Sequence, residues 1–433
     1  KINNFILNSG KKKIFYIKFN KKFYKQFNFQ AFFDEKNSLI KILYHKILAP
    51  ILNKNKILFD LSNIGLKKLK LNFFFYQLPC WVDYMFNFKI YERLFKERSL
   101  VNNQLRNSFK KKYKKKNFFN FLISNIYDDL PIVFLEDFKK IVDSIKDIKL
   151  RPQIVVSDSK EFNLFFKFWI SLNKSNKIRF FRSDHGGSYM SNLDDMTHEE
   201  YSNYSIRWFR YKTNNSVQLP ILHNLKKRAQ PKRRTKALII THSVDKYPHH
   251  ILWSPTGKEN FFQSKILYDL TKRVNPEIKK NLYLKTYPDE YVHKEWSCNK
   301  EFKKIFLRKK IITDKKIFKQ IFLISKINIC LYPQTAFIES ILSGPTILIL
   351  HKDFYRIRPD FEDIHLKLEK ANILFHNGSA ACHHINKVWN NIDDWWQDEK
   401  VKKIRKSFEK LTCKNLSEKE TTKEWIKYFK KFI

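Results

Sequence analysis

One stretch in the last third of the chain constrains the fold most, because strand, helix and strand signals follow one another within a few residues. Residues 327–332 are short, apolar and β-branched, as a buried strand is, and Pro333 ends that run. Thr335 stands where a helix is capped, ahead of apolar positions at helical spacing in residues 336–342. Residues 346–350 form a second apolar run. This order predicts a βαβ unit of a parallel sheet.

The turn between the first strand and the helix of this unit lies at the carboxyl edge of the predicted sheet, where open α/β proteins bind ligands. The N–H groups of the first helical turn, with Thr335 beside them, suit a phosphate group. Glu339 lies one turn further along the helix and could reach a ribose diol. The alternative is an ordinary βαβ unit with a hydroxyl cap and an exposed glutamate.

The same alternation recurs and predicts an α/β fold with two domains. Residues 224–236 are basic and polar and contain a proline, so they are the best linker. We therefore expect one α/β domain at residues 1–230 and a second at 235–433, with a cleft between their sheets and a helical C-terminal tail. Further strand-like runs lie at residues 154–156, 177–181, 206–209, 237–240 and 281–285, and a helix is expected at 259–273.

The strand expected at 177–181 runs into a polar segment that is our first candidate for catalysis. The chain has only seven glycines, so the adjacent Gly186 and Gly187 indicate a turn with positive φ or a close approach to a ligand. His185 is placed to act as a general base on an acceptor hydroxyl or to hydrogen-bond a donor group. Asp184 is the alternative base. A histidine that only stabilises the turn is the competing interpretation.

Four polar residues of the second half are candidates for the donor side of the same cleft. Lys285 and Tyr287 follow a predicted strand and could meet a phosphate and a base or sugar, although a lysine at a strand end is also common on surfaces. His242 ends the first strand of this half. Arg358 follows the last strand of the βαβ unit and could clamp a diphosphate or pair with a carboxylate such as Asp360.

Missing motifs and the cysteines exclude several classes of protein. No GxGxxG or GxxxxGK[ST] motif occurs, so neither a nicotinamide enzyme nor a P-loop NTPase is expected. The Asp-x-Asp pattern that often holds a metal–diphosphate is missing too, so we expect a site without metal. Five cysteines without a CxxC pair indicate reduced thiols in the cytosol. No apolar run reaches the length that spans a bilayer.

The formal net charge of +43 would ordinarily point to nucleic acid or to an anionic membrane. Lysine is abundant along the whole chain, together with Asn, Ile and Phe, which indicates a chain-wide bias, so no specific nucleic acid is expected. Residues 102–117, with their lysine run, read as a solvated charged surface rather than an RNA site. Aromatic residues alternate with lysine through the first 120 residues, so recruitment to an anionic membrane surface stays open.

Several segments resemble known families. Residues 339–347 are similar to the Glu-x-x-x-x-Gly-x-Pro-Val/Ile segment in the donor domain of GT-B glycosyltransferases, with one residue fewer between glycine and proline. The combination of YPQTAFIES at 332–340, HGGSY at 185–189 and FYRIRPDFE at 354–362 resembles a family of bacterial transferases associated with surface-polysaccharide synthesis. This resemblance extends from about Leu78 to about Glu409.

The resemblance implies a GT-B-like fold, in which two Rossmann-like domains face a cleft. The N-terminal domain would bind the acceptor and the C-terminal domain a nucleotide-sugar. By matching positions, Gln334, Thr335 and Glu339 would hold the donor, and His185 would lie across the cleft. The nucleotide-sugar would be a substrate, with no separate cofactor. The acceptor would be a glycan or a lipid-linked precursor, at the inner face of the cell membrane in the cytoplasm.

In the expected reaction, His185 or Asp184 deprotonates an acceptor hydroxyl, and that oxygen attacks the anomeric carbon of the donor. The helix at Thr335, with Lys285 or Arg358, stabilises the departing nucleotide. Another reaction on the same fold, such as sugar-nucleotide epimerisation or glycerophosphate transfer, is the first alternative. A basic nucleic-acid-binding protein is the alternative from another class, and it predicts steeply salt-dependent binding to generic nucleic acid.

Overall fold

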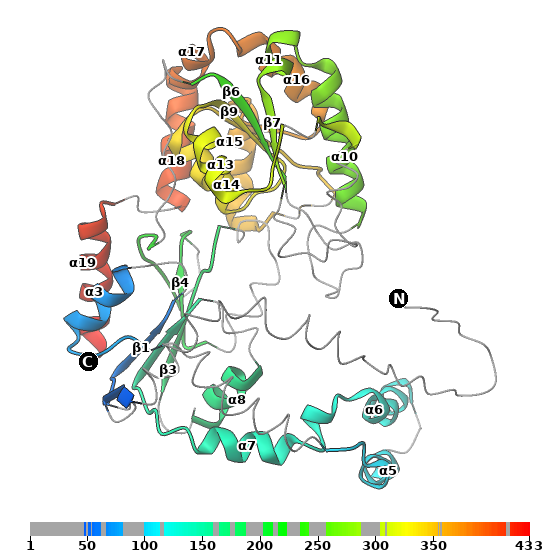
Figure 1. Ribbon diagram of the computed structural model, residues 1–433, viewed down its shortest axis with the longest axis vertical. Coiled ribbons are helices and arrows are strands. Elements are labelled where there is room, and N and C mark those ends of the chain that lie inside the picture. The colour runs from blue at the N-terminus through cyan, green and yellow to red at the C-terminus, as the bar shows by residue number, and fades with distance from the viewer. Residues whose placement is uncertain are drawn as a thin grey trace, which may run out of the picture.

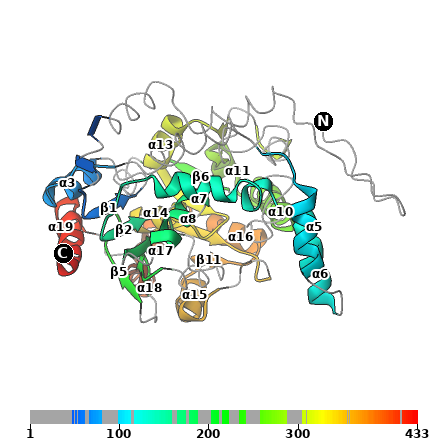
Figure 2. The ribbon, with the colours of Figure 1, turned by 90° about the horizontal axis from the view of Figure 1, so that it is seen from below.

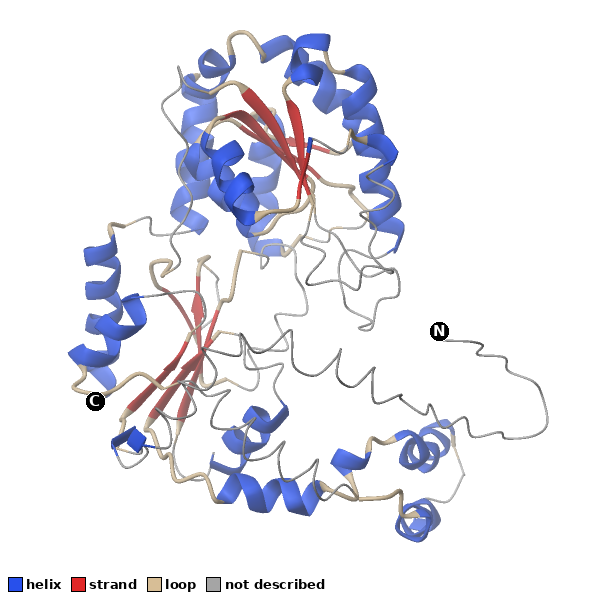
Figure 3. Cartoon of the chain, in the orientation of Figure 1, coloured by secondary structure: helices blue, strands red, loops and turns tan. Residues whose placement is uncertain are grey.

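The computed structural model describes most of the chain, and every statement below concerns the part that it describes. Within that part the strands form two parallel sheets, each with helices on both faces (Figures 1 and 3), so the predicted α/β fold with two sheets is confirmed. The described residues are 47–48, 51–52, 54–61, 66–80, 99–112, 117–158, 164–173, 178–187, 202–210, 215–222, 234–241, 257–286, 304–307, 310–353, 355, 357–412 and 416–433.

The first sheet has the strand order β1-β2-β3-β4-β5, so each crossover moves one strand further in the same direction. Adjacent strand residues alternate between the two faces, as the pleat requires. Phe180 points into the core under the helices α7 and α8, whereas Phe181 points into the core under α3 and α19. The strands are β1 (Ile57–Asp60), β2 (Ile154–Ser157), β3 (Arg179–Ser183), β4 (Tyr204–Arg207) and β5 (Ser216–Gln218), and the helices are α3 (Leu66–Phe74), α7 (Phe138–Lys146), α8 (Leu164–Asn173) and α19 (Glu418–Phe429).

The last helix, α19, lies on the first sheet, although we expected residues 235–433 to form one domain with its own C-terminal helices. Its Phe429 ring packs against Phe59 and Phe181 with centroids 5.4 and 5.3 Å away. Trp425 donates its indole N–H to the Pro220 carbonyl at 2.8 Å. This face of the first sheet is apolar and needs a cover, and α19 with α3 provides it.

The second sheet has the order β11-β10-β9-β6-β7-β8, so its direction of winding reverses between β6 and β9. In open parallel sheets the carboxyl ends of the two strands at such a reversal are where ligands bind. The strands are β6 (Lys236–Ile240), β7 (Leu282–Lys285), β8 (Ile311–Ile312), β9 (Ser325–Cys330), β10 (Thr346–Ile349) and β11 (Leu374–Phe375), which confirms the strands expected in this half.

Two groups of helices cover the second sheet. One face carries α10 (Gly257–Arg273), α11 (Pro276–Lys280) and α16 (Gly378–Val388), and the other carries α13 (Lys315–Leu323), α14 (Thr335–Ser343), α15 (Glu362–Lys370) and α18 (Glu399–Thr412), with α17 (Ile392–Gln397) at the edge between them. Short 3-10 turns lie at Ile132–Phe134, Pro359–Phe361 and Lys430–Phe432. We call residues 47–222 with 416–433 the first half, and residues 234–412 the second half.

An apolar contact joins the two halves. Trp208 and Phe209, just past β4, belong to the same buried cluster as Phe337 of α14 and Phe361 of the second half. The rings of Phe209 and Phe361 meet edge to face with centroids 5.5 Å apart. The Arg210 backbone N–H also donates to the carbonyl of Leu411, at the end of α18, at 2.8 Å. The two sheets are therefore held beside each other by buried aromatic side chains.

Two helices lie at the edge of the first half. They are α5 (Asn103–Lys112) and α6 (Phe118–Asp129), which pack against each other. Figure 2 shows them on the opposite side of the molecule from α3 and α19. In the described part of the chain, no helix is long and apolar enough to cross a bilayer.

Candidate functional site

The carboxyl end of β3 meets the start of α14, and this contact brings the halves together at their strand ends. The Gly187 backbone N–H donates to the Thr335 hydroxyl oxygen at 3.0 Å. A Cβ on Gly186 would lie 2.7 Å from that hydroxyl oxygen, and one on Gly187 would collide with the Ile338 side chain. Among the described glycines only Gly344 has a positive φ. The glycine pair therefore serves a close approach between the halves and not a left-handed turn.

Helix α14 begins at the reversal point of the second sheet, directly after β9. Thr335 is its first residue, and the N-cap is Gln334, whose side chain makes no capping hydrogen bond. We expected Thr335 to be the cap, which is wrong, because its hydroxyl accepts the hydrogen bond from the other half. The positive end of the α14 dipole thus lies against the first half, at the position where open sheets bind anions.

His185 lies beside this contact and faces a carboxylate. Its Nδ1 is 3.8 Å from an Asp158 carboxylate oxygen, with the histidine side chain half-exposed and the aspartate buried. Asp158 follows β2 and His185 follows β3, and the two strands are neighbours in parallel register. A buried carboxylate in this place orients an imidazole and stabilises its protonated form. Asp158 was not among the site residues predicted from the sequence, although its position directly after a predicted strand was a signal that could have found it.

Asp184, the alternative base, has both of its carboxylate oxygens engaged in buried hydrogen bonds. One of its carboxylate oxygens accepts from Arg207 Nη1 at 2.8 Å and the other from the Trp208 backbone N–H at 2.8 Å. Arg182 lies 3.7 Å from the same carboxylate, and all of these side chains are buried. Because both oxygens are engaged away from solvent, Asp184 ties the end of β3 to the end of β4. A role as catalytic base does not fit this environment.

The two predicted cations of the donor side are held inside the second half. The Lys285 ammonium donates to the Thr286 carbonyl and lies over the Phe318 ring, 5.5 Å from its centroid. Arg358 is buried with Nη2 4.0 Å from the Asp360 carboxylate, which is the pairing left open above.

Glu339 lies one turn into α14, and it is buried rather than exposed. Its neighbour Ser340 accepts a hydrogen bond from Asn328 on β9 at 2.9 Å. The helix is therefore fixed to the sheet through a neutral polar pair. His242 and Tyr287, the remaining candidates, lie outside the described residues.

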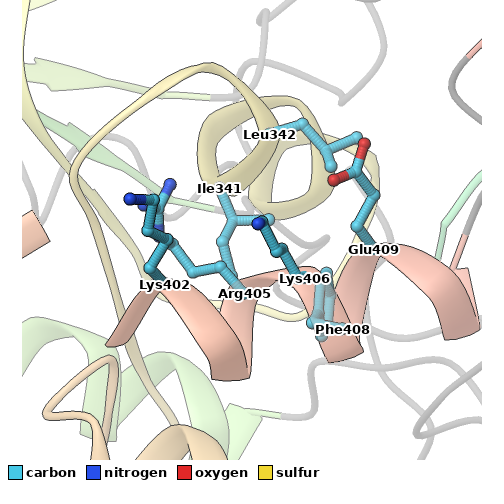
Figure 4. Close-up of a pocket in the computed structure, with 7 residues that line it drawn as sticks. All are labelled: Ile341, Leu342, Lys402, Arg405, Lys406, Phe408 and Glu409. Carbon is cyan, nitrogen blue, oxygen red and sulfur yellow. The ribbon is translucent and has the colours of Figure 1, made fainter. Parts of the chain in front are cut away.

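A cavity of about 220 Å³ opens between α14 and α18 (Figure 4). Its walls combine apolar side chains with three cations and one carboxylate, from Ile341, Leu342, Lys402, Arg405, Lys406, Phe408 and Glu409. It borders the last turn of α14, whereas the contact between the halves is at the first turn, so this cavity is not the strand-end site. The described residues hold no group of three or more His, Cys, Asp or Glu side chains suited to a metal ion.

The chain is similar to several solved structures. The wall teichoic acid polymerase TagF is 11% identical over 92% of this chain and 98% of that chain, with a TM-score of 0.39. The lipopolysaccharide outer core galactosyltransferase WaaB is 10% identical over 70% and 83%, with a TM-score of 0.37. MurG of Acinetobacter baumannii is 7% identical over 87% and 98%, also at 0.37.

No curated protein matches the chain. A protein-family model does match, over residues 5–429, and the expected resemblance to a transferase family is thereby confirmed. The match includes the strand-end loop at His185, the α14 helix and the returning helix α19. The chain therefore belongs to the LIC12162 family of transferases.

Proposed function

We propose that this transferase is a glycosyltransferase that moves a sugar from a nucleotide-sugar to a hydroxyl group of a surface-glycan precursor, without a metal ion or a separate cofactor. The observation that carries the proposal is the contact between Gly187 and Thr335. It places an imidazole with a carboxylate partner next to the positive end of a helix at a sheet reversal. A proton acceptor and an anion site side by side are what sugar transfer to a hydroxyl needs.

The donor would bind to the second half at the start of α14. Its diphosphate would lie against the first-turn N–H groups and the Thr335 hydroxyl, with Gln334 beside them. Glu339 would reach the ribose diol from one turn further on. Lys285 and Arg358 stay candidates for the donor side only if they leave their present partners, since both are engaged within the second half.

The acceptor would bind to the first half, with His185 as the base. As the acceptor oxygen forms its bond to the anomeric carbon, its proton passes to His185, and Asp158 stabilises the imidazolium. The bond between the anomeric carbon and the diphosphate oxygen breaks, and the nucleoside diphosphate leaves with its new charge facing α14. The acceptor would be a glycan or a lipid-linked precursor, so the enzyme would act in the cytoplasm at the inner face of the membrane.

Donor entry would require the halves to part, because the Thr335 hydroxyl is occupied by Gly187 in the present arrangement. The buried aromatic contact of Phe209 with Phe361 also joins the halves and would act as the pivot. Closure would then bring His185 back over the bound donor and exclude water from the site.

The test is a thermal-shift screen of the chain with UDP, GDP, CMP, CDP, dTDP and their sugars. One nucleotide class should stabilise the wild type, and Thr335→Ala and Glu339→Ala should lose that stabilisation. Ser343→Ala is the matched control, since it removes a hydroxyl from the opposite end of the same helix. His185→Gln should keep the shift and lose turnover. If only polyanions shift the wild type, and all variants behave alike, the chain is a basic binding protein instead.

A further inference from the structure

Helix α6 is rich in apolar residues, and many of them are exposed. It reads FFNFLISNIYDD, and none of its described side chains is buried. The most exposed apolar side chains of this helix are Phe118 at 74%, Phe119 at 67%, Ile126 at 53%, Leu122 at 49% and Phe121 at 48%. A soluble surface rarely presents so many large apolar side chains together, so this face fits a partner.

These side chains lie on one face of the helix. Phe118, Leu122 and Ile126 follow one another at four-residue spacing, and Phe119 and Phe121 flank them. At about 100° per residue, the five cover an arc of roughly 160°. Another part of the helix contacts α5, where Tyr127 stacks on Phe109 with ring centroids 5.1 Å apart. The exposed arc is therefore the face that α5 leaves uncovered.

The pair α5–α6 is held firmly to the first half, so the exposure of α6 is not the fraying of a loose end. Arg106 is buried and donates to the carbonyls of Tyr127, Asp128 and Leu130 at the end of α6. The same guanidinium donates to both carboxylate oxygens of Glu136, at 2.7 and 2.9 Å. This hydrogen-bonded pairing lowers the pKa of Glu136 to about 2. Such a bidentate pair fixes both partners in one geometry.

Positive charge accompanies the apolar face. The last turn of α5 carries Lys110 and Lys111. Lys110 pairs with Asp128 at the end of α6, and Lys111 is exposed. An apolar helical face beside lysines is the pattern of an element that lies in the interface of an anionic bilayer. A second copy of the chain fits less well, because two molecules of formal net charge +43 repel each other.

We propose that α6 docks on an anionic lipid surface, with its apolar face at the boundary between headgroups and acyl chains and the α5 lysines on the headgroup phosphates. This surface lies on the first half, which is the half proposed to bind the acceptor. Docking would therefore bring a lipid-linked acceptor to the enzyme. The inference itself depends on the exposed face and its charge, and not on the chemistry of sugar transfer.

The experiment is co-sedimentation of the full chain with vesicles of phosphatidylcholine, with and without phosphatidylglycerol. The wild type should bind the vesicles that contain phosphatidylglycerol. Phe118→Ser/Leu122→Ser should weaken that binding about tenfold or more, since two large apolar side chains no longer enter the interface. The matched control is Phe261→Ser/Leu366→Ser, which changes the same residue types at 76% and 56% exposure in the second half. It should bind like the wild type.

The charge is tested separately. Lys111→Glu should weaken binding about fivefold or more, and added salt should weaken the binding of the wild type. Lys387→Glu on α16 is the control, as an exposed lysine in the second half, and should have little effect. Thermal melting of every variant checks the fold, and the nucleotide thermal shifts should be unchanged. A failed nucleotide screen therefore does not count against docking.

Three outcomes would overturn the inference. The first is that the wild type does not bind vesicles with phosphatidylglycerol. The second is equal binding by Phe118→Ser/Leu122→Ser and its control. The third is a lipid-free dimer in analytical ultracentrifugation that only Phe118→Ser/Leu122→Ser abolishes, because α6 would then be covered by a second copy.

Discussion

The two sheets differ in the polar groups that they bury. The first sheet buries charges at its strand ends, whereas the strands of the second bury mostly neutral groups, with Lys285 as the exception. The other buried charges of the second half, Glu259, Glu339 and Arg358, lie on helices or in a loop. The buried charges of the first sheet are Asp60, Asp158, Arg182, Asp184 and Arg207, and the neutral groups of the second include Thr241, Thr286, Asn328 and Thr346. The first half thus has fixed charges at the place where the proposed proton transfer would occur. At its strand ends the second half offers a helix end and mostly neutral groups, which leave most of the charge to be supplied by a ligand.

Because of this difference, substitutions at buried polar residues should destabilise the first half more than the second. A buried ion pair depends on both partners, because removing one leaves a charge without compensation in a medium of low polarity. A neutral buried hydrogen bond loses far less when one partner is removed. The first half should therefore be the more sensitive to single substitutions at its strand ends, and the predictions below test that contrast.

The largest effect is expected at Arg207, which is fully buried against Asp184. Arg207→Met should destabilise the first half by about 3–5 kcal/mol, since the Asp184 carboxylate loses its main partner. Ser340→Ala is the counterpart in the second half and should cost about 1 kcal/mol, because Asn328 loses a neutral hydrogen bond. Urea unfolding measures both, and hydrogen exchange assigns each loss to a half. Equal losses would remove the contrast.

Lowering the pH should reverse this order of sensitivity and destabilise the second half first. His384 is buried between Phe375 and Trp395, and burial lowers its pKa to about 4. The folded state therefore resists protonation that the unfolded state accepts. The free energy of unfolding is therefore unaffected by His384 above about pH 6.5. It falls by roughly 3 kcal/mol as the pH is lowered from about 6.5 to about 4.

The first half keeps its acid-sensitive pair to lower pH. Arg106 lowers the pKa of Glu136 to about 2 from the ordinary 4.5, so this contribution is full above about pH 4.5 and is lost only toward pH 2. Hydrogen exchange at a series of pH values should show the second half loosening before the α5–α6 pair. His384→Phe should remove the step between pH 6.5 and 4. A step of the same size in that variant would mean that another group causes it.

A smaller effect is expected where the halves meet. In Gly187→Ala the added methyl group collides with the Cδ1 atom of Ile338, at a cost of about 1–3 kcal/mol to the closed arrangement. Small-angle scattering should then show a more open molecule, and turnover should fall while each half stays folded. Gly187→Ala/Ile338→Val lacks the colliding atom and should close again. If the single variant scatters like the wild type, the halves do not depend on this approach.

The smallest effects are expected at helix caps, one in each half. Ser417 and Glu420 form a reciprocal capping box at the start of α19, and Asp314 accepts from two backbone N–H groups at the start of α13. Ser417→Ala and Asp314→Ala should each cost about 1 kcal/mol. Hydrogen exchange should show looser amides in α19 for the first variant and in α13 for the second. Loosening of both helices in either variant would mean that the halves unfold together.

The strands of the second half were predictable because their signals are local. Residues 237–240 and 346–350 were apolar runs between turns, and the structure has β6 and β10 there. The helix at 259–273 matched α10 within two residues at its start. The place of α14 at the carboxyl edge followed from the same order of elements. Local periodicity decides such features, so no tertiary information was required.

Pairings between distant segments were not predictable in this way. The two carboxylates at the ends of β2 and β3 look alike in sequence, yet Asp158 faces His185 and Asp184 is neutralised by Arg207. Only the packing of β4 beside β3 separates their roles. The Thr335 hydroxyl would suit a cap, but a backbone N–H from the other half takes it. The packing of α19 on the first sheet depends on which face of that sheet the other helices leave partly uncovered. A local sequence pattern does not contain this information.

Because α19 packs on the first sheet, the protein cannot be divided experimentally into two independent pieces by a single cut. A piece cut from the chain between residues 222 and 234 would carry all five strands of the first sheet but not α19. Phe59 and Phe181 would then lose the ring of Phe429 and face water. Such a piece should be prone to aggregate when expressed alone. Co-expression with residues 234–433 should restore it, so the two pieces should be recovered together as a complementing pair.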